Sequence, residues 1–225
     1  MKWSVITKLI IILSMIAITQ GCGVSQRPLS APDPALALRL NSQATTVYPE
    51  DAEKARKILQ KALRADPFCG PALNNLGALY LEENRLDKAF ESLESARRIM
   101  PMDPRPHVNL GLLFANVNQY ENAIAEYDEA LRLNPDYMPA IMQKAWLQIH
   151  EDRADDTTLP ALEKIAIRAH EEEWRDFGRK YSMRLRSRSE LGLDRPSNIF
   201  DENTGNEDNV ITSPVQIDDG DNNNN

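Results

Sequence analysis

The sequence predicts an all-α fold: an α-solenoid of helix hairpins, closed by a C-terminal capping helix and followed by a disordered tail. Two observations predict it. A short pattern of residue types recurs at a spacing of 34, and the apolar residues within each period follow helical spacing. Aromatic residues make up only 6% of the 225 residues. Because a single hairpin cannot bury its apolar face alone, successive hairpins must stack on one another.

Residues 1–21 are predicted to be an export signal. Lys2 and Lys8 accompany an uncharged apolar run at 9–18, which is too short to cross a hydrocarbon core of about 30 Å but typical of a signal peptide. The run ends at Gly21-Cys22, which resembles the lipobox of bacterial lipoproteins, although Thr19 stands where that family usually has an aliphatic residue. The resemblance implies that Cys22 is the lipidated first residue of the mature chain.

The residue after the cysteine is Gly23, which in that family implies the outer membrane, with the protein facing the periplasm. Residues 22–35 contain Ser, Gln and Pro and are predicted to form a flexible tether. An ordinary secretory signal that happens to contain a cysteine is the alternative. The sequence therefore predicts a lipid-anchored protein of the bacterial cell envelope.

The internal repeat is clearest where Asn74–Tyr80 aligns with Val108–Phe114 at an offset of 34. Small, aromatic, aliphatic and proline positions all match at this offset. The matched pairs are Gly77/Gly111, Tyr80/Phe114, Ala89/Ala123, Leu93/Tyr127, Ala96/Ala130, Ile99/Leu133 and Pro101/Pro135.

These positions resemble the tetratricopeptide repeat, a helix-turn-helix unit of 34 residues. The resemblance covers residues 36–170, with well-formed units at 70–103 and 104–137 and degenerate units on either side. It implies a solenoid that binds other proteins. We expect Gly77 and Gly111 to be small because the two helices of a unit cross there, facing Ala89 and Ala123.

The flanking helices are predicted from apolar spacing. One runs through Ala35 to Ala44 and another from Met138 to Ile149. A third, Thr158 to His170, has Thr158 as its N-cap and an apolar face of Leu159, Leu162, Ile165 and Ala166. Residues 171–190 form the capping helix, with Trp174, Phe177, Tyr181 and Leu185 in one stripe. Residues 191–225 are acidic and rich in Asn, with too little apolar content to offset ordering entropy.

The first helix of each unit is predicted to line a concave groove that binds a peptide. Asn and Gln offer both donors and acceptors to a peptide backbone, while Leu, Met and Trp offer apolar pockets. Arg105 is the only basic residue there, which disfavours a carboxylate clamp. The alternative is that Asn75 and Asn109 serve only the fold. The candidates are Asn74, Asn75, Ala78, Val108, Asn109, Leu112, Asn116, Met142, Gln143 and Trp146.

Charge is unevenly spread. The net charge is −8, and from Asp194 onward eight acidic residues stand against one base, Arg195, which gives −7 for the tail alone. The folded part is thus close to neutral and has no nucleic-acid footprint. The bases of the capping helix have three interpretations: a solvated helix end, contact with anionic lipid, or neutralisation by the acidic tail. They are Arg179, Lys180, Arg184, Arg186 and Arg188.

No pattern predicts catalysis, a cofactor, a metal site or a small-molecule substrate. The three histidines, His107, His150 and His170, have no second ligand at metal spacing, and Cys69 is predicted to pack between units. The predicted function is a membrane-anchored scaffold or assembly factor, with similarity to pilotins and Tad-type pilus components. The alternatives are an adaptor of a peptidoglycan enzyme or an enzyme with an unrecognised site.

Overall fold

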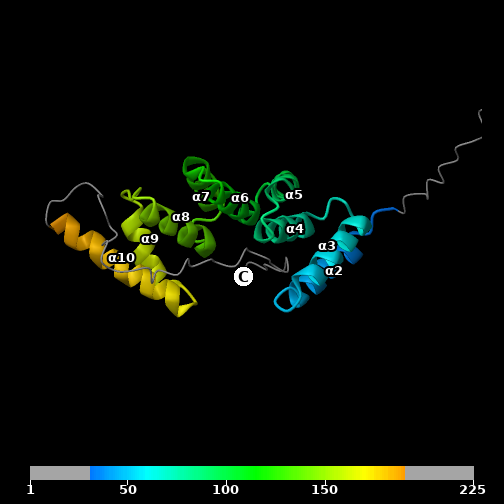
Figure 1. Ribbon diagram of the computed structural model, residues 1–225, viewed down its shortest axis with the longest axis horizontal. Helices are drawn as coiled ribbons and strands as arrows, with labels where there is room; N and C mark the ends of the chain where they lie inside the picture. Colours follow the sequence, from blue (N-terminus) through cyan, green and yellow to red (C-terminus); the bar gives the residue numbers. More distant parts are fainter. Residues whose placement is uncertain (1–30, 191–225) are drawn as a thin grey trace, which may run out of the picture. The chain divides into compact units, whose positions relative to one another are not determined.

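The computed structural model describes residues 31–190, and these contain nine α-helices and no strand. The first eight form four hairpins, and the ninth packs on the last of them (Figure 1). The hairpins are α2 (Pro34–Val47) with α3 (Ala52–Ala65), α4 (Gly70–Glu82) with α5 (Leu86–Ile99), α6 (Pro104–Asn116) with α7 (Tyr120–Leu133), and α8 (Met138–His150) with α9 (Thr158–Arg168). The ninth helix is α10 (Glu172–Glu190). The prediction of an all-α solenoid is confirmed.

Several sequence predictions lie outside the described residues: the export signal at 1–21, Cys22, most of the tether and the tail at 191–225. Chain contacts divide the sequence between Pro32 and Asp33. All nine described helices belong to the unit that begins at Asp33, one residue before the first helix of the repeat array.

The hairpins pack in sequence order and form two layers. Each second helix contacts the first helix of the next hairpin, and the first helices α2, α4, α6 and α8 also contact one another in series. The second helices α3, α5, α7 and α9 make no comparable contacts with one another within residues 31–190. The first helices are therefore the closely packed inner layer and the second helices the outer layer.

The hairpin turns repeat with the same period as the sequence. Asn84, Asn118 and Asp152 follow α4, α6 and α8 and have positive φ angles of 54°, 58° and 51°. After Asn84, the amide of Arg85 donates to the carbonyl of Tyr80 at 2.8 Å, and the other two turns make the equivalent bond. This is a Schellman motif, which satisfies the last carbonyls of each first helix.

The two repeat glycines lie where the helices of a hairpin cross, as predicted, but their nearest neighbours differ from the prediction. A Cβ at Gly77 would lie 2.6 Å from Cγ of Leu93, and one at Gly111 would lie 2.3 Å from Cε1 of Tyr127. Leu93 and Tyr127 lie one turn beyond Ala89 and Ala123, the residues predicted to face the glycines. Because both large side chains are buried, they occupy the space that the missing glycine side chains leave.

The fourth hairpin departs from the period only after its turn. Asp152 keeps the register of Asn84 and Asn118. Yet α9 begins six residues after it, whereas α5 and α7 begin two residues after their turn asparagines. Four extra residues therefore shift the second helix, in which Leu162 and Ile165 are the fully buried apolar residues.

The predicted N-cap role of Thr158 is wrong. Thr158 is the first helical residue and Thr157 precedes it as N-cap, with no side-chain capping bond of its own. Asp155 organises the turn instead: its carboxylate accepts the amide of Thr157 at 2.8 Å, and its own amide donates to the Thr158 hydroxyl at 2.9 Å. Of the apolar face predicted for α9, Leu162 and Ile165 are buried, while Leu159 and Ala166 are half-buried.

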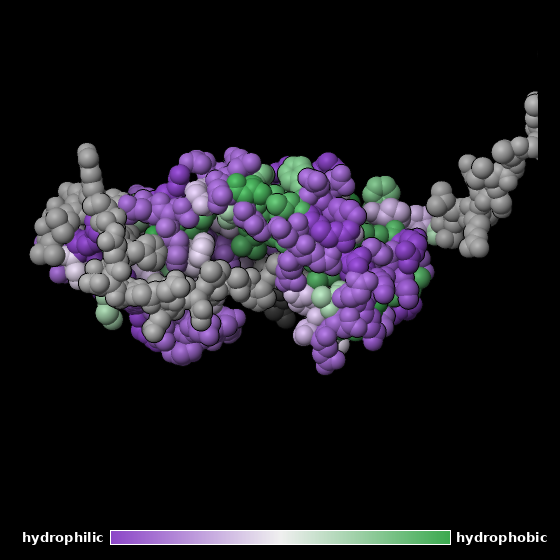
Figure 2. Space-filling view, viewed as in Figure 1, coloured by the Kyte–Doolittle hydropathy of each residue, from purple (hydrophilic) through white to green (hydrophobic). Residues whose placement is uncertain are grey.

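The last helix closes the array through its aromatic stripe. Trp174, Phe177 and Tyr181 are buried and join Leu162 and Ile165 of α9 in one apolar cluster, against which Leu185 also packs. Gly178 lets α10 approach α9 closely, since a Cβ there would lie 2.6 Å from the amide nitrogen of Ala166 and from the carbonyl oxygen of Leu162. The surface in Figure 2 is mainly hydrophilic, with hydrophobic residues gathered around α6.

Candidate peptide-binding face

Side-chain amides form a row along the inner layer. Asn41 of α2, Asn75 of α4, Asn109 of α6 and Gln143 of α8 follow one another at intervals of 34 residues. We call these four residues the carboxamide row. Each occupies the same position in its hairpin, so stacking the hairpins brings the amides into line.

Hydrogen bonds connect most of this row. Asn75 Nδ2 donates to Asn41 Oδ1 at 2.9 Å, Asn74 Nδ2 donates to Asn75 Oδ1 at 3.4 Å, and Asn109 Nδ2 donates to Asn74 Oδ1 at 3.0 Å. These four asparagines are fully buried. A buried polar group is costly unless it is hydrogen-bonded, so the row ties three first helices together in a fixed register.

A second contact across an interval of 34 residues links the C-terminal ends of α2 and α4. The Tyr48 hydroxyl donates to the Glu82 carboxylate, 34 residues further along the chain. Desolvation raises the pKa of the Glu82 carboxyl, although the bond from Tyr48 lowers it. Desolvation and the bond to Glu82 also raise the pKa of the Tyr48 hydroxyl. Tyr48 therefore remains a neutral donor.

The predicted groove residues all lie on inner-layer helices, but they differ in exposure. Trp146 and Leu112 are half-buried and Asn116 is exposed. The remaining seven have little or no exposed surface: Asn74, Asn75, Ala78, Val108, Asn109, Met142 and Gln143. A ligand therefore reaches these seven only by displacing atoms of the chain itself.

An aromatic cluster lies at the α8 end of the inner layer. The rings of Trp146 and His150 stack with centroids 4.0 Å apart, and His150 stacks on Phe177 at 6.0 Å with an interplanar angle of 8°. Tyr181 packs on Phe177 at 4.7 Å. His150, for which the sequence predicted no metal-binding partner, thus links α8 to α10 through its ring contacts.

His107 and Cys69, a histidine and a cysteine with reactive side chains, also have structural roles. His107 Nδ1 lies 2.7 Å from Glu126 Oε2, and Arg97 reaches the other oxygen of Glu126 at 3.4 Å, so α5, α6 and α7 are joined. Cys69 is buried at the start of α4, where burial raises the pKa of its thiol. This agrees with a packing role for Cys69 and not with an activated nucleophile.

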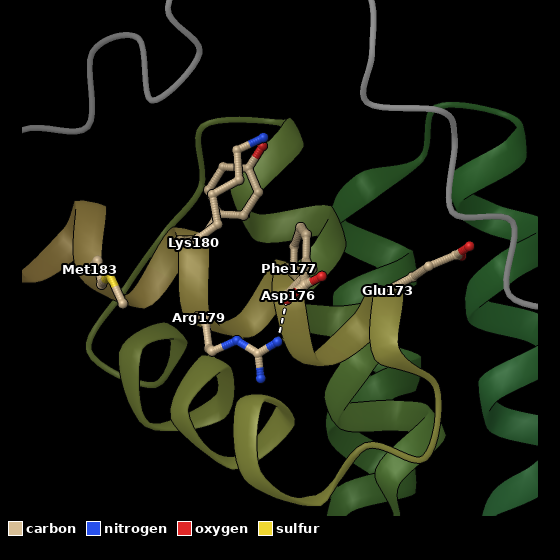
Figure 3. A pocket seen from close by; sticks show the side chains of 7 residues that line it. Glu173, Asp176, Phe177, Arg179, Lys180 and Met183 are labelled. Carbon is tan, nitrogen blue, oxygen red and sulfur yellow. Dashed lines mark hydrogen bonds and ion pairs between the residues drawn. The ribbon is translucent and has the colours of Figure 1, made fainter.

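A hollow of about 480 Å³ lies along α10 (Figure 3). Arg179 turns toward Asp176 on the same helix, whereas Lys180 leaves the helix in another direction. Small-molecule sites usually bring polar groups together from several elements, but the lining residues all belong to one helix. They are Glu173, Asp176, Phe177, Arg179, Lys180, Tyr181 and Met183. The inner layer is therefore the stronger candidate for a binding face.

Within residues 31–190, no helix combines the length and the apolar character that a membrane crossing requires. In the same range, His, Cys, Asp and Glu side chains do not gather in threes where a metal ion could bind.

Stacked hairpins with an inner layer of first helices define a helical-repeat scaffold. Two models of the tetratricopeptide repeat match the sequence, one over residues 49–110 and the other over residues 104–137. Residues 49–137 therefore form tetratricopeptide repeats, and such repeats are scaffolds for protein–protein interaction.

Several solved structures are similar to this chain. A tetratricopeptide repeat protein from Parabacteroides merdae is 20% identical, with a TM-score of 0.52 over 71% of this chain and 68% of its own. The crystal structure of MamA is 17% identical, with a TM-score of 0.47 over 72% of this chain and 82% of its own. MamA from Desulfovibrio magneticus RS-1 is 19% identical, with a TM-score of 0.48 over 79% and 98%. No curated protein matches the sequence significantly.

Proposed function

We propose that this protein is a lipid-anchored scaffold of the bacterial cell envelope, which binds an extended segment of a partner protein along the inner layer and catalyses no reaction. The observation that carries the binding proposal is the carboxamide row. A carboxamide can donate two hydrogen bonds and accept two. Once the atoms that bury the row are displaced, one amide can therefore pair along the row and also bond a peptide backbone, whose amide and carbonyl groups recur at regular spacing.

The aromatic cluster supplies the apolar part of the face. Trp146 is half-buried and its ring is held by His150, so it offers a rigid surface at low entropic cost. Leu112 is likewise half-buried on α6. Trp146 and Leu112 would bind apolar side chains of the partner segment, while its backbone forms hydrogen bonds with the carboxamide row.

The envelope location rests on the sequence of residues 1–23, which carry the apolar run and the Gly21-Cys22 junction. Assembly of a Tad-type pilus is the specific pathway that we favour for such an anchored scaffold, and it stays a prediction from resemblance.

Site-specific photo-crosslinking in membranes of the source bacterium tests the binding face. A crosslinker replaces Leu112 or Trp146, and the matched control replaces Glu91, which is exposed on the outer helix α5. We expect one partner to crosslink from the two inner positions and not from Glu91. The crosslinked segment, made as a peptide, should bind the purified protein and lose affinity for Trp146→Ala. Equal crosslinking from all three positions would contradict an inner-layer binding face.

A further inference from the structure

The outer helix of the first hairpin, α3, carries a row of exposed bases. Four bases follow one another at intervals of three, four and three residues, which is the spacing of a single helix face. All four are exposed, whereas the opposite face, which includes Ile58 and Leu59, is buried in the hairpin. We call the four bases the α3 stripe. They are Lys54, Lys57, Lys61 and Arg64.

The other outer helices lack a comparable charge. Helix α3 has five bases and one acid, whereas α5 has three of each, α7 has one base and four acids, and α9 has two bases and one acid. The single acid of α3, Glu53, pairs with Lys57 at 3.3 Å and also with Arg56. Among the ion pairs within residues 31–190, the other three bases of the stripe have no carboxylate partner. The stripe is therefore a surface of uncompensated positive charge.

The stripe ends where the chain enters the repeat array. The amide of Asp33 donates to the carbonyl of Ala65 at 2.8 Å, so the start of the first hairpin lies against the last residue of α3. Phe68 follows shortly after and is 71% exposed. An exposed apolar ring beside cations can enter the head-group region of a bilayer while the cations stay at its surface. The predicted tether thus joins the body at the Arg64 end of the stripe.

The predicted lipid attachment is close along the chain. Cys22 precedes Asp33 by eleven residues, and eleven residues span at most about 38 Å. Helix α3 has 14 residues and is about 21 Å long. An anionic bilayer attracts bases near its surface, over a Debye length of about 8 Å at physiological salt. A short tether therefore holds the stripe at a high effective concentration beside the bilayer.

We propose that the α3 stripe binds anionic lipid head groups of the membrane that holds the anchor. This inference rests on the proposed function, which supplies the lipid at Cys22. The buried apolar face of α3 is committed to the hairpin, so the contact is peripheral and made by the charged face. Four cations along about 15 Å of one helix can meet several head groups of a planar surface at once. Because α3 belongs to the outer layer, this contact leaves the inner layer free to bind a partner segment.

Lysine acetylation in the intact protein tests the contact. The lipidated protein is purified and bound to vesicles of phosphatidylcholine or of phosphatidylglycerol, and isolated membranes of the source bacterium are treated in parallel. An amine reagent that does not cross bilayers is added, and mass spectrometry gives the rate at each lysine. Lys88, which is exposed on α5, is the internal control. The same spectra show whether Cys22 carries acyl chains.

We expect the three lysines of the stripe to be acetylated at least threefold more slowly on phosphatidylglycerol than on phosphatidylcholine. The rate at Lys88 should be the same on both lipids. Addition of 1 M NaCl should remove the difference, since salt screens the attraction between exposed charges and the bilayer.

A double variant tests whether the stripe acts as a unit. Lys61→Gln with Arg64→Gln should restore fast acetylation of the two remaining stripe lysines on phosphatidylglycerol, because each base near an anionic surface adds about fivefold in affinity. The matched control, Arg98→Gln with Arg132→Gln, removes two exposed bases of α5 and α7. The control should keep the protection seen in the wild type.

Equal rates on the two lipids, or slowing of Lys88 together with the stripe, would overturn the proposal. Protection in the isolated membranes but not on phosphatidylglycerol would also overturn it and assign the stripe to a protein partner. The anchor fails in a different way. An unacylated Cys22 removes the anchor and this proposal with it, whereas an acylated Cys22 with unchanged lysine rates leaves the anchor standing and overturns this proposal alone.

Discussion

At the residue scale, the period of 34 is carried by positions with unusual geometric demands as well as by apolar positions. Asn84, Asn118 and Asp152 all adopt positive φ angles, a region in which most L-residues are strained and in which Asn and Asp are tolerated. The sequence shows Asn or Asp at these three positions, 34 residues apart, and this pattern would have predicted where all three hairpin turns lie. The side chains lie in turns with few apolar neighbours, so a search for apolar periodicity misses them.

Asn84→Ala should therefore destabilise the protein by about 1 kcal/mol, because alanine tolerates the left-handed conformation less well than asparagine. Asn84→Gly should retain or slightly raise the free energy of unfolding, since glycine adopts this conformation without strain. Urea unfolding followed by circular dichroism measures both. Equal losses for Ala and Gly would show that the Asn84 side chain itself, and not the backbone conformation, stabilises the turn.

Gly111→Leu should prevent normal packing of the third hairpin. A Cβ alone would lie 2.3 Å from the Tyr127 ring, which is 1% exposed and cannot move into solvent. Overpacking of this kind costs up to about 3 kcal/mol. The thermal midpoint of the variant should fall by several degrees, while Gly70→Ala should have a smaller effect because its closest neighbour is the flexible side chain of Met100. An unchanged midpoint for Gly111→Leu would contradict the observed helix crossing.

At the element scale, the two central hairpins could be predicted closely and the fourth could not. Helices α4 to α7 follow the matched pattern of glycine, alanine and aromatic residues, so the sequence alone located them. In α9 the four extra residues after Asp152 moved the register. Thr157 lies 34 residues after Ala123, so a threonine where the period expects alanine indicated only that the pattern changes there. Asp155 fixes the new start through hydrogen bonds, and hydrogen bonds within a turn of this kind leave no periodic signal.

The docking of α10 depends on a glycine that sequence reasoning did not single out. Gly178→Ala should separate α10 from α9, because the added Cβ would meet backbone atoms of Leu162 and Ala166 that cannot rotate away. The emission maximum of Trp174, which is 3% exposed, should shift to longer wavelength as the indole ring becomes exposed to water. Ser187→Ala lies on an exposed part of the same helix and should leave the spectrum unchanged. A Trp174 spectrum that is identical in both variants would show that α10 docks without close backbone contact.

At the scale of the whole molecule, the candidate binding face is harder to predict than the fold. Sequence periodicity placed the groove candidates on the inner-layer helices, but it gave no indication that Asn41 completes the carboxamide row or that His150 joins α8 to α10. Both features arise from contacts between different units. Asn41 lies in a degenerate repeat where Ser42 and Gln43 replace the Leu-Gly pair, which hid its equivalence to Asn75.

The proposed lipid anchor also concerns the whole molecule, because it would decide where the binding face operates. Cys22→Ser should release the protein from membranes. In bacterial lipoproteins, which residues 1–22 resemble, a thioether joins the lipid to the cysteine, and serine cannot form it. Several acyl chains hold a protein stably at a bilayer, whereas one chain gives only marginal binding. The variant should therefore move from the membrane pellet to the soluble fraction after fractionation.

Cys69→Ser is the matched control, since Cys69 is buried at the start of α4, and it should remain in the pellet. Mass spectrometry of the wild type should show acyl chains on Cys22 as the first residue. An unmodified Cys22, or a Cys22→Ser protein that stays in the pellet, would rule out the lipid anchor while leaving the repeat array and its carboxamide row unaffected.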